Sequence, residues 1–84
     1  MTYVFDIDGT ICTNTNGRYK EAVPFKDRIE KINRLYEEGN KIIFLTARGM
    51  GRSDNSAAYA YSAFYDFTRD QLLDWGVKFS GLYL

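Results

Sequence analysis

Two aspartates near the N-terminus are the residues whose type and spacing most clearly indicate chemistry. Asp6 and Asp8 lie in the run Phe-Asp-Ile-Asp-Gly-Thr, which ends in Gly9 and Thr10. Side chains alternate along a strand, so acids two residues apart are expected on the same side. Two carboxylates with oxygen-only surroundings suit Mg²⁺, and a glycine after them lets the backbone turn so that its amides face an anion. The spacing therefore predicts a site for magnesium and an anionic group.

A threonine further along the chain is expected to join these acids. Thr46 ends the apolar run at residues 41–46, just as the acids end the run at residues 3–7. Open α/β sheets bind ligands at the carboxyl ends of their strands, so the Thr46 hydroxyl is predicted beside the same pocket. Arg48 and Arg52 follow in the next loop. Each either meets an anionic substrate or is a solvated loop charge.

The elements that position these residues follow from hydrophobic spacing. Residues 3–7, 41–46 and 79–84 are β-prone, and residues 24–38 and 56–75 carry apolar side chains at helical intervals. Gly39 and Gly76 end the two helices, and residues 11–23 and 49–55 are loops. Strand, helix, strand, helix, strand is typical of a parallel α/β sheet in one domain, residues 1–84. The second run is apolar at successive positions, which predicts a strand buried on both faces.

The helix faces and one further stripe are also predicted from spacing. The first helix should bury one face and the second a longer one: Phe25, Ile29, Ile32 and Tyr36, then Ala57, Tyr61, Phe64, Thr68, Leu72 and Trp75. Tyr59, Ala63 and Phe67 form a second stripe, which either packs on a neighbouring loop or joins subunits of a homo-oligomer.

Composition excludes several classes of protein. Eleven Lys and Arg balance eleven Asp and Glu, which lacks the basic excess of a dedicated nucleic-acid binder. One cysteine, Cys12, precludes an intramolecular disulfide, and the absence of histidine precludes a Cys/His zinc cluster. The longest apolar run, residues 57–61, is far short of the ~20 residues that span a bilayer. We therefore expect a soluble, cytoplasmic protein without a nucleic-acid or membrane partner.

The motif and the strand-end threonine together resemble the haloacid dehalogenase superfamily of phosphohydrolases. Within it, the triplet Thr46-Ala47-Arg48 is similar to that of small capless phosphatases of bacterial capsule and polysaccharide biosynthesis. The resemblance implies a Rossmann-like core and a small phosphorylated substrate, a sugar or sugar acid. A calcium loop is the alternative for the acids, and it fails because Ile11 and Gly17 replace its glycine and its closing glutamate.

The resemblance also implies a role for each matching residue. Asp6 would be the nucleophile that forms an aspartyl phosphate, and Asp8 the general acid and then the general base. The Asp6 carboxylate and the Asp8 carbonyl would hold Mg²⁺. The phosphate would be bound by Gly9, Thr10, Thr46 and Arg48. Within this group, Arg48 would contact the anionic periphery of the substrate.

The family's third and fourth motifs, a lysine and an acidic pair, are absent from the sequence. Lys78 precedes the third strand and is a poor substitute. The chain is therefore expected to be the first part of a longer phosphatase, and alone to leave one sheet face bare and to self-associate. The alternative is a catalytically incomplete module that binds Mg²⁺ and phosphate. A phosphoacceptor receiver domain fits poorly, because its phosphorylated aspartate follows a later strand.

Overall fold

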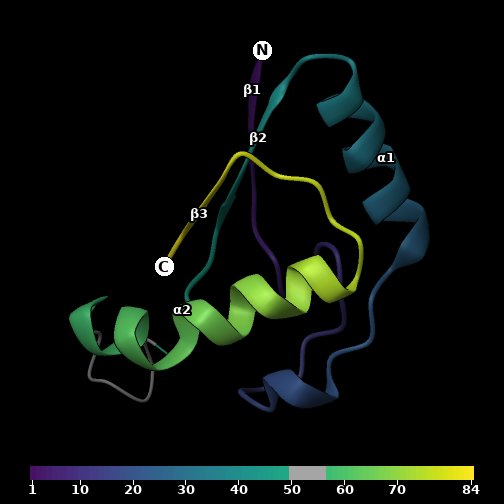
Figure 1. Cartoon of the computed structure of the whole chain (residues 1–84). Helices are drawn as coiled ribbons and strands as arrows, with labels where there is room; N and C mark the ends of the chain where they lie inside the picture. The colour runs from purple at the N-terminus through teal and green to yellow at the C-terminus, as the bar shows by residue number, and fades with distance from the viewer. Residues whose placement is uncertain (50–56) are drawn as a thin grey trace.

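The chain folds around a three-stranded parallel sheet with two helices, which confirms the predicted α/β architecture. The computed structural model describes residues 1–49 and 57–84. Its elements are β1 (Thr2–Phe5), the 3₁₀ helix η1 (Tyr19–Glu21), α1 (Lys26–Glu37), β2 (Lys41–Leu45), α2 (Ala57–Asp74) and β3 (Gly81–Tyr83) (Figure 1). The strand order is β1-β2-β3, with both pairs parallel. All three strands are shorter than the sequence predicts, and β1 ends before the first acid.

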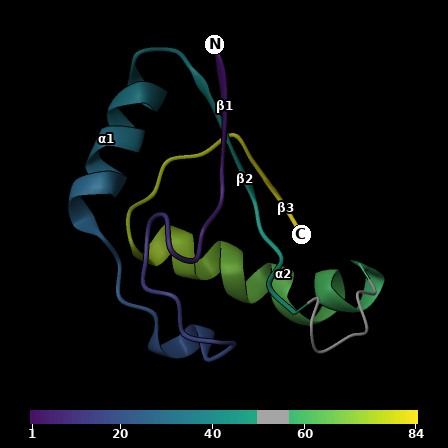
Figure 2. The same cartoon turned by 180° about the vertical axis from the view of Figure 1, so that it is seen from behind.

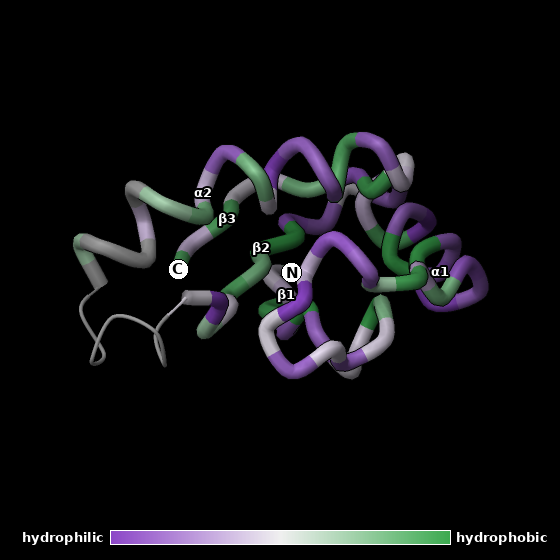
Figure 3. Tube along the Cα trace, turned by 90° about the horizontal axis from the view of Figure 1, so that it is seen from below, coloured by the Kyte–Doolittle hydropathy of each residue, from purple (hydrophilic) through white to green (hydrophobic). Residues whose placement is uncertain are grey.

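One face of the sheet carries the hydrophobic core. Both helices lie to the same side of the strands when the chain is viewed from below (Figure 3). Ile42 and Phe44 of β2 are fully buried there and form one cluster with residues of α1, α2 and β3: Ile29, Ile32, Leu72 and Leu82. Two right-handed crossovers that run in the same direction place their helices on the same face, which accounts for this arrangement.

The other face of the sheet is open in the part of the chain that the structure describes. Val4 is 59% exposed, Leu45 54% and Tyr83 56%. The register pairs Leu45 with Tyr83, and Val4 with Ile43, which lies two residues before Leu45, so all four share this face. The prediction that the second strand is buried on both faces is therefore wrong for these residues, because neither helix reaches the second face.

The first helix ends as predicted and buries Ile29 and Ile32 as predicted, but its last turn places Leu35 instead of Tyr36 against the core. Gly39 has φ +97°, and its N–H donates to the carbonyl of Tyr36. The side chain of Asn40 then donates to the carbonyl of Leu35 at 2.9 Å, which satisfies one of the last helical acceptors. Leu35 packs against the core while Tyr36 is 39% exposed, so the predicted position of Tyr36 on the buried face is wrong.

The second helix runs across the sheet near the carboxyl ends of β1 and β2 (Figures 1 and 2). Thr68 and Leu72 are fully buried, whereas Tyr61 is 52% exposed and lies off the core. Gly76, at φ +73°, ends the helix as predicted. No helix among the described residues is both long and apolar enough to span a membrane.

The loop between β1 and α1 folds back on itself as a flap, residues 13–23. Its ends are joined by Thr13, whose N–H donates to the carbonyl of Val23 at 3.0 Å and whose hydroxyl accepts the N–H of Val23 at 2.9 Å. At its tip η1 places Tyr19 toward α2, and a hollow of about 390 Å³ separates the flap from Ala63 and Phe67. Ala63 and Phe67, two members of the predicted second stripe, thus face the flap. The side chain of Tyr59 and the predicted loop residues 50–55 lie outside the part of the chain that the structure describes.

Candidate active site

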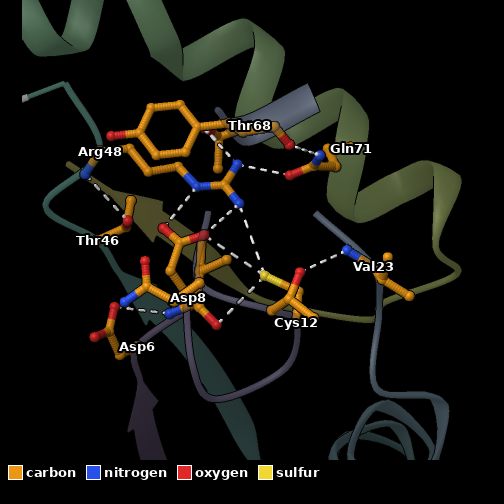
Figure 4. A network of polar contacts seen from close by, with 12 residues as sticks. Asp6, Asp8, Cys12, Val23, Thr46, Arg48, Thr68 and Gln71 are labelled. Atoms are coloured by element: carbon orange, nitrogen blue, oxygen red, sulfur yellow. Dashed lines mark hydrogen bonds and ion pairs between the residues drawn. The ribbon is translucent and has the colours of Figure 1, made fainter. Parts of the chain in front are cut away.

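The two aspartates of the motif lie in the loop that follows β1, in two different environments. Because β1 ends at Phe5, the strand alternation that predicted a shared side for Asp6 and Asp8 does not extend to them. Asp6 is exposed, and its Oδ1 accepts the N–H of Ile7 at 2.8 Å. The Asp8 side chain is 18% exposed and turns toward Arg48 (Figure 4).

A tight turn fixes the backbone after Asp8. The N–H groups of Thr10 and Ile11 both donate to the carbonyl of Ile7 at 3.0 Å, and that of Gly9 donates to the carbonyl of Cys12 at 2.9 Å. Gly9 has φ +84°, a backbone conformation that favours glycine. The amides of Gly9 and Thr10 are thus committed to the turn, and the prediction that they face an anion does not match this geometry.

An arginine of α1 supports the same turn from outside. The exposed Arg28 donates from Nη1 to the carbonyl of Thr10 at 3.0 Å and to that of Gly9 at 3.4 Å. Its guanidinium also lies over the ring of Phe25, 4.8 Å from the ring centroid. The amphipathic pattern of the helix gave no indication of this contact.

Asp6 and Thr46 meet at one hollow at the carboxyl ends of β1 and β2. The hollow measures about 440 Å³ and is lined by Asp6, Thr46 and five neighbours: Val4, Phe5, Leu45, Ala47 and Leu84. Thr46 is 4% exposed, its N–H donates to the carbonyl of Tyr83 at 3.0 Å, and its hydroxyl accepts the N–H of Arg48 at 3.2 Å. The structure therefore places at one hollow the two residues for which the resemblance implies the roles of nucleophile and phosphate binding.

Arg48 does not lie at the outer edge of the site, where the sequence analysis placed it. It is 1% exposed and forms a two-pronged ion pair with Asp8, Nε to Oδ2 at 3.0 Å and Nη2 to Oδ1 at 2.9 Å. Its Nη1 donates to Oε1 of Gln71 at 2.6 Å and to the hydroxyl of Thr68 at 3.5 Å (Figure 4). The guanidinium also lies over the ring of Tyr19, 4.7 Å from the centroid.

Three residues of this network were not predicted from the sequence. Thr68 carried a usable signal, since it is a polar residue in the middle of the predicted apolar face of α2. Gln71 and Tyr19 carried none, because they reach Arg48 from α2 and from the flap through tertiary contacts. The flap cations Arg18 and Lys20 are exposed, and Arg52, a cation that the sequence placed in the loop after Thr46, lies outside the described residues.

Cys12 lies beside the ion pair as a buried neutral thiol. Its Sγ is 3.6 Å from Oδ1 of Asp8 and 3.7 Å from the carbonyl of Ile7. Burial, followed by the nearby Asp8 carboxylate, raises the pKa of Cys12 to about 11. A thiol with such a pKa is a weak nucleophile at neutral pH, which agrees with the predicted packing role.

The donors at this edge of the sheet fit a magnesium ion. No cluster of three or more acids, cysteines or histidines occurs among residues 1–49 and 57–84. Mg²⁺ does not require one, because it commonly keeps several waters and takes one or two protein oxygens together with substrate phosphate. The exposed Asp6 carboxylate offers such an oxygen. The Asp8 carboxylate is occupied by Arg48, which leaves the backbone carbonyl of Asp8, the second donor that the resemblance implies.

Comparison with known proteins places the fold. No family model and no curated protein matches the chain. A crystal structure of a Vibrio cholerae protein superposes with a TM-score of 0.90 at 21% identity, over 98% of this chain and 67% of that one. A D,D-heptose 1,7-bisphosphate phosphatase from B. bronchiseptica, solved with magnesium and phosphate, gives 0.63 at 17% identity, over 98% of this chain and 48% of that one. The chain therefore has the same Rossmann-like α/β fold as these two proteins and spans about half of the second one.

Proposed function

We propose that this chain carries the nucleophile portion of a magnesium-dependent phosphomonoester hydrolase that acts through an aspartyl phosphate. The observation that carries the proposal is the contrast between the two acids. Asp6 is exposed in a hollow with Thr46, whereas Asp8 is held by Arg48. A nucleophile must be reachable by phosphorus, and a group that transfers protons must keep its position.

The reaction then proceeds in two steps on these side chains. An Asp6 carboxylate oxygen attacks phosphorus, and the bond from phosphorus to the ester oxygen breaks. Asp8, after it has taken up a proton from solvent and released one of its two bonds with Arg48, passes that proton to the departing oxygen. In the second step Asp8 takes a proton from water, whose oxygen attacks phosphorus and releases the Asp6 carboxylate and inorganic phosphate. Thr46 would donate its hydroxyl to the phosphoryl oxygens. Magnesium, held by the Asp6 carboxylate and the Asp8 carbonyl, would offset phosphoryl charge when bound.

For the substrate we propose a phosphorylated sugar or sugar acid of bacterial capsule or polysaccharide biosynthesis. The similar phosphatase from B. bronchiseptica acts on a heptose bisphosphate, which supports a sugar phosphate. The hollow beside Asp6 opens on the bare sheet face, and residues 9–46 hold only the flap, α1 and β2, which leaves no room for a cap domain between Thr10 and Thr46. We also propose that residues 1–84 are the first part of a longer domain, in which further chain covers the face of Val4 and Tyr83.

The alternative is a module that binds magnesium and phosphate without turnover. One observation favours it: Nζ of Lys78 lies 3.1 Å from Oε1 of Glu37, in an exposed ion pair with α1. This pairing makes Lys78 a poor replacement for the family's catalytic lysine. The described residues thus provide the nucleophile without a cation of that kind.

Two assays distinguish the hydrolase from the binding module: hydrolysis of a chromogenic phosphate ester with Mg²⁺, and trapping of beryllium fluoride on Asp6. A hydrolase turns the ester over, and Asp6→Asn abolishes both turnover and trapping while the circular dichroism spectrum stays unchanged. The binding module traps beryllium fluoride at Asp6 without turnover. Equal turnover by wild type and Asp6→Asn would refute the assignment of the nucleophile.

A further inference from the structure

The ion pair between Arg48 and Asp8 differs from the other ion pairs of the described chain. The Arg48 side chain is 0% exposed, whereas the arginine and lysine of the remaining pairs, Arg69 and Lys78, are 43% and 48% exposed. Two nearly parallel bonds, of 3.0 and 2.9 Å, join Nε and Nη2 to the two oxygens of Asp8. Such a fork fixes the plane of the carboxylate as well as its distance, which a single bond cannot do.

The remaining donors of Arg48 are also occupied by the protein. A guanidinium has five N–H groups, one on Nε and two on each Nη. Nη1 serves Gln71 and Thr68, at 2.6 and 3.5 Å. The second N–H of Nη2 points to Sγ of Cys12 at 3.9 Å. Arg48 could therefore bind a phosphoryl group only by giving up one of these contacts.

Two elements distant in sequence hold the guanidinium in place. The ring of Tyr19 lies against its face, and the hydroxyl of Tyr19 accepts the N–H of Gly49 at 3.0 Å. Gln71 contacts Arg48 through its Oε1 and donates its Nε2 to the carbonyl of Tyr19 at 2.8 Å. The flap, α2 and the loop after Thr46 thus meet at the Arg48 side chain, which in turn contacts both carboxylate oxygens of Asp8.

We propose that Arg48 is a positioning residue that fixes the Asp8 carboxylate, and that Gln71 and Tyr19 hold Arg48 for this purpose. The inference rests on the proposed function, since it assigns to Asp8 the proton transfers of a phosphatase. It replaces the expected contact of Arg48 with substrate. Removal of the Arg48 guanidinium should lower kcat and leave KM nearly unchanged, because Arg48 donates its N–H groups to Asp8 and not to the bound ester.

The kinetic test compares Arg48→Met and Arg48→Lys with a matched surface control, Arg69→Met. We expect a loss of about 10²-fold in kcat for Arg48→Met, partial recovery with Lys, less than 3-fold change in KM, and wild-type kinetics for the control. In an Asp8→Asn background, Arg48→Met should cost less than about 3-fold more, because residues that act as a unit are not additive. A raised KM with unchanged kcat, or full additivity, would overturn the proposal.

A second measurement serves if Arg48→Met does not fold or if the wild-type chain turns nothing over. The Nε–H resonance of Arg48 in ¹⁵N NMR should exchange slowly with water, and both Asp8→Asn and Gln71→Met should shift it and speed its exchange. The exposed Arg69 provides the fast-exchanging reference. Absence of turnover would reject the proposed function alone. An Arg48 resonance that exchanges as fast as that of Arg69, or that ignores Asp8→Asn, would reject the positioning proposal.

Discussion

Replacement of Gly49 by alanine tests the packing next to Arg48 most directly. Gly49 is buried with φ +83°, and a Cβ at this position would meet Cδ2 of Phe64 and lie 2.8 Å from its Cε2. The Phe64 ring packs edge-on against Tyr19 with 5.5 Å between centroids, so a shift of the ring that relieves the overlap would disturb this contact. The left-handed backbone costs a side chain about 1–2 kcal/mol, and overpacking adds about 1–3 kcal/mol. We therefore expect Gly49→Ala to lower the free energy of unfolding by about 2–5 kcal/mol.

Gly39→Ala is the matched control for the backbone part of this cost. Gly39 has φ +97°, and a Cβ there would meet no atom within 4 Å, so only about 1–2 kcal/mol should be lost. Urea or thermal unfolding followed by circular dichroism measures both variants, and each kcal/mol corresponds to about 4–8 °C in Tm at this size. Phe64→Leu should cost less in the Gly49→Ala background than in the wild type, since it relieves the clash. Equal destabilisation by the two glycine substitutions would refute the packing described for Phe64.

Three further outcomes are expected. Cys12 should be alkylated by iodoacetamide at pH 8 about 100-fold more slowly in the folded chain than in urea. Burial raises the pKa of its thiol from 9.0 to about 11, and this difference lowers the thiolate fraction at pH 8 by about that factor. Comparable alkylation rates in the folded and the urea-unfolded chain at pH 8 would contradict the burial of Cys12. Because the folded chain favours the neutral thiol, the contribution of Cys12 to the free energy of unfolding is fully present below about pH 9 and is lost between pH 9 and 11. Asn33→Ala should destabilise the chain by about 1–3 kcal/mol in urea, because it removes a bond to the Gly76 carbonyl and one from the Lys78 N–H, both 2.8 Å. Lys78→Met should change the free energy of unfolding by less than about 1 kcal/mol, as its pair with Glu37 is exposed, and a larger loss would show a role beyond this pair.

The sequence predicted the order of the elements because periodicity and helix ends are local signals. Spacings of three and four residues identified both helices, and Gly39 and Gly76 marked their ends at the positive φ angles that the structure shows. Exposure was less predictable. Ile43 and Leu45 are as apolar as Ile42 and Phe44, so composition alone could not tell which face of β2 the helices would cover.

The candidate site was predicted in its parts but not in its connections. Thr46 and Asp6 follow neighbouring parallel strands, and their meeting at one hollow follows from topology. The direction of the Arg48 side chain does not follow from topology, because it depends on Gln71 and on the ion pair with Asp8, 40 positions earlier in the chain. Contacts of that kind have no repeat in the sequence, and an arginine in a polar loop resembles any solvated charge.

The burial of Arg48 is difficult to explain by stability alone. Removing a guanidinium and a carboxylate from water costs several kcal/mol per ion, and apolar replacements of similar volume are often as stable or more so. The chain nevertheless surrounds this cation with a ring, an amide and a hydroxyl, from Tyr19, Gln71 and Thr68. What the arrangement provides is a fixed orientation of one carboxylate, while Asp6, two residues away, stays exposed. Two acids of the same type are thereby given different environments, which is how a pair of carboxylates comes to serve different chemical roles.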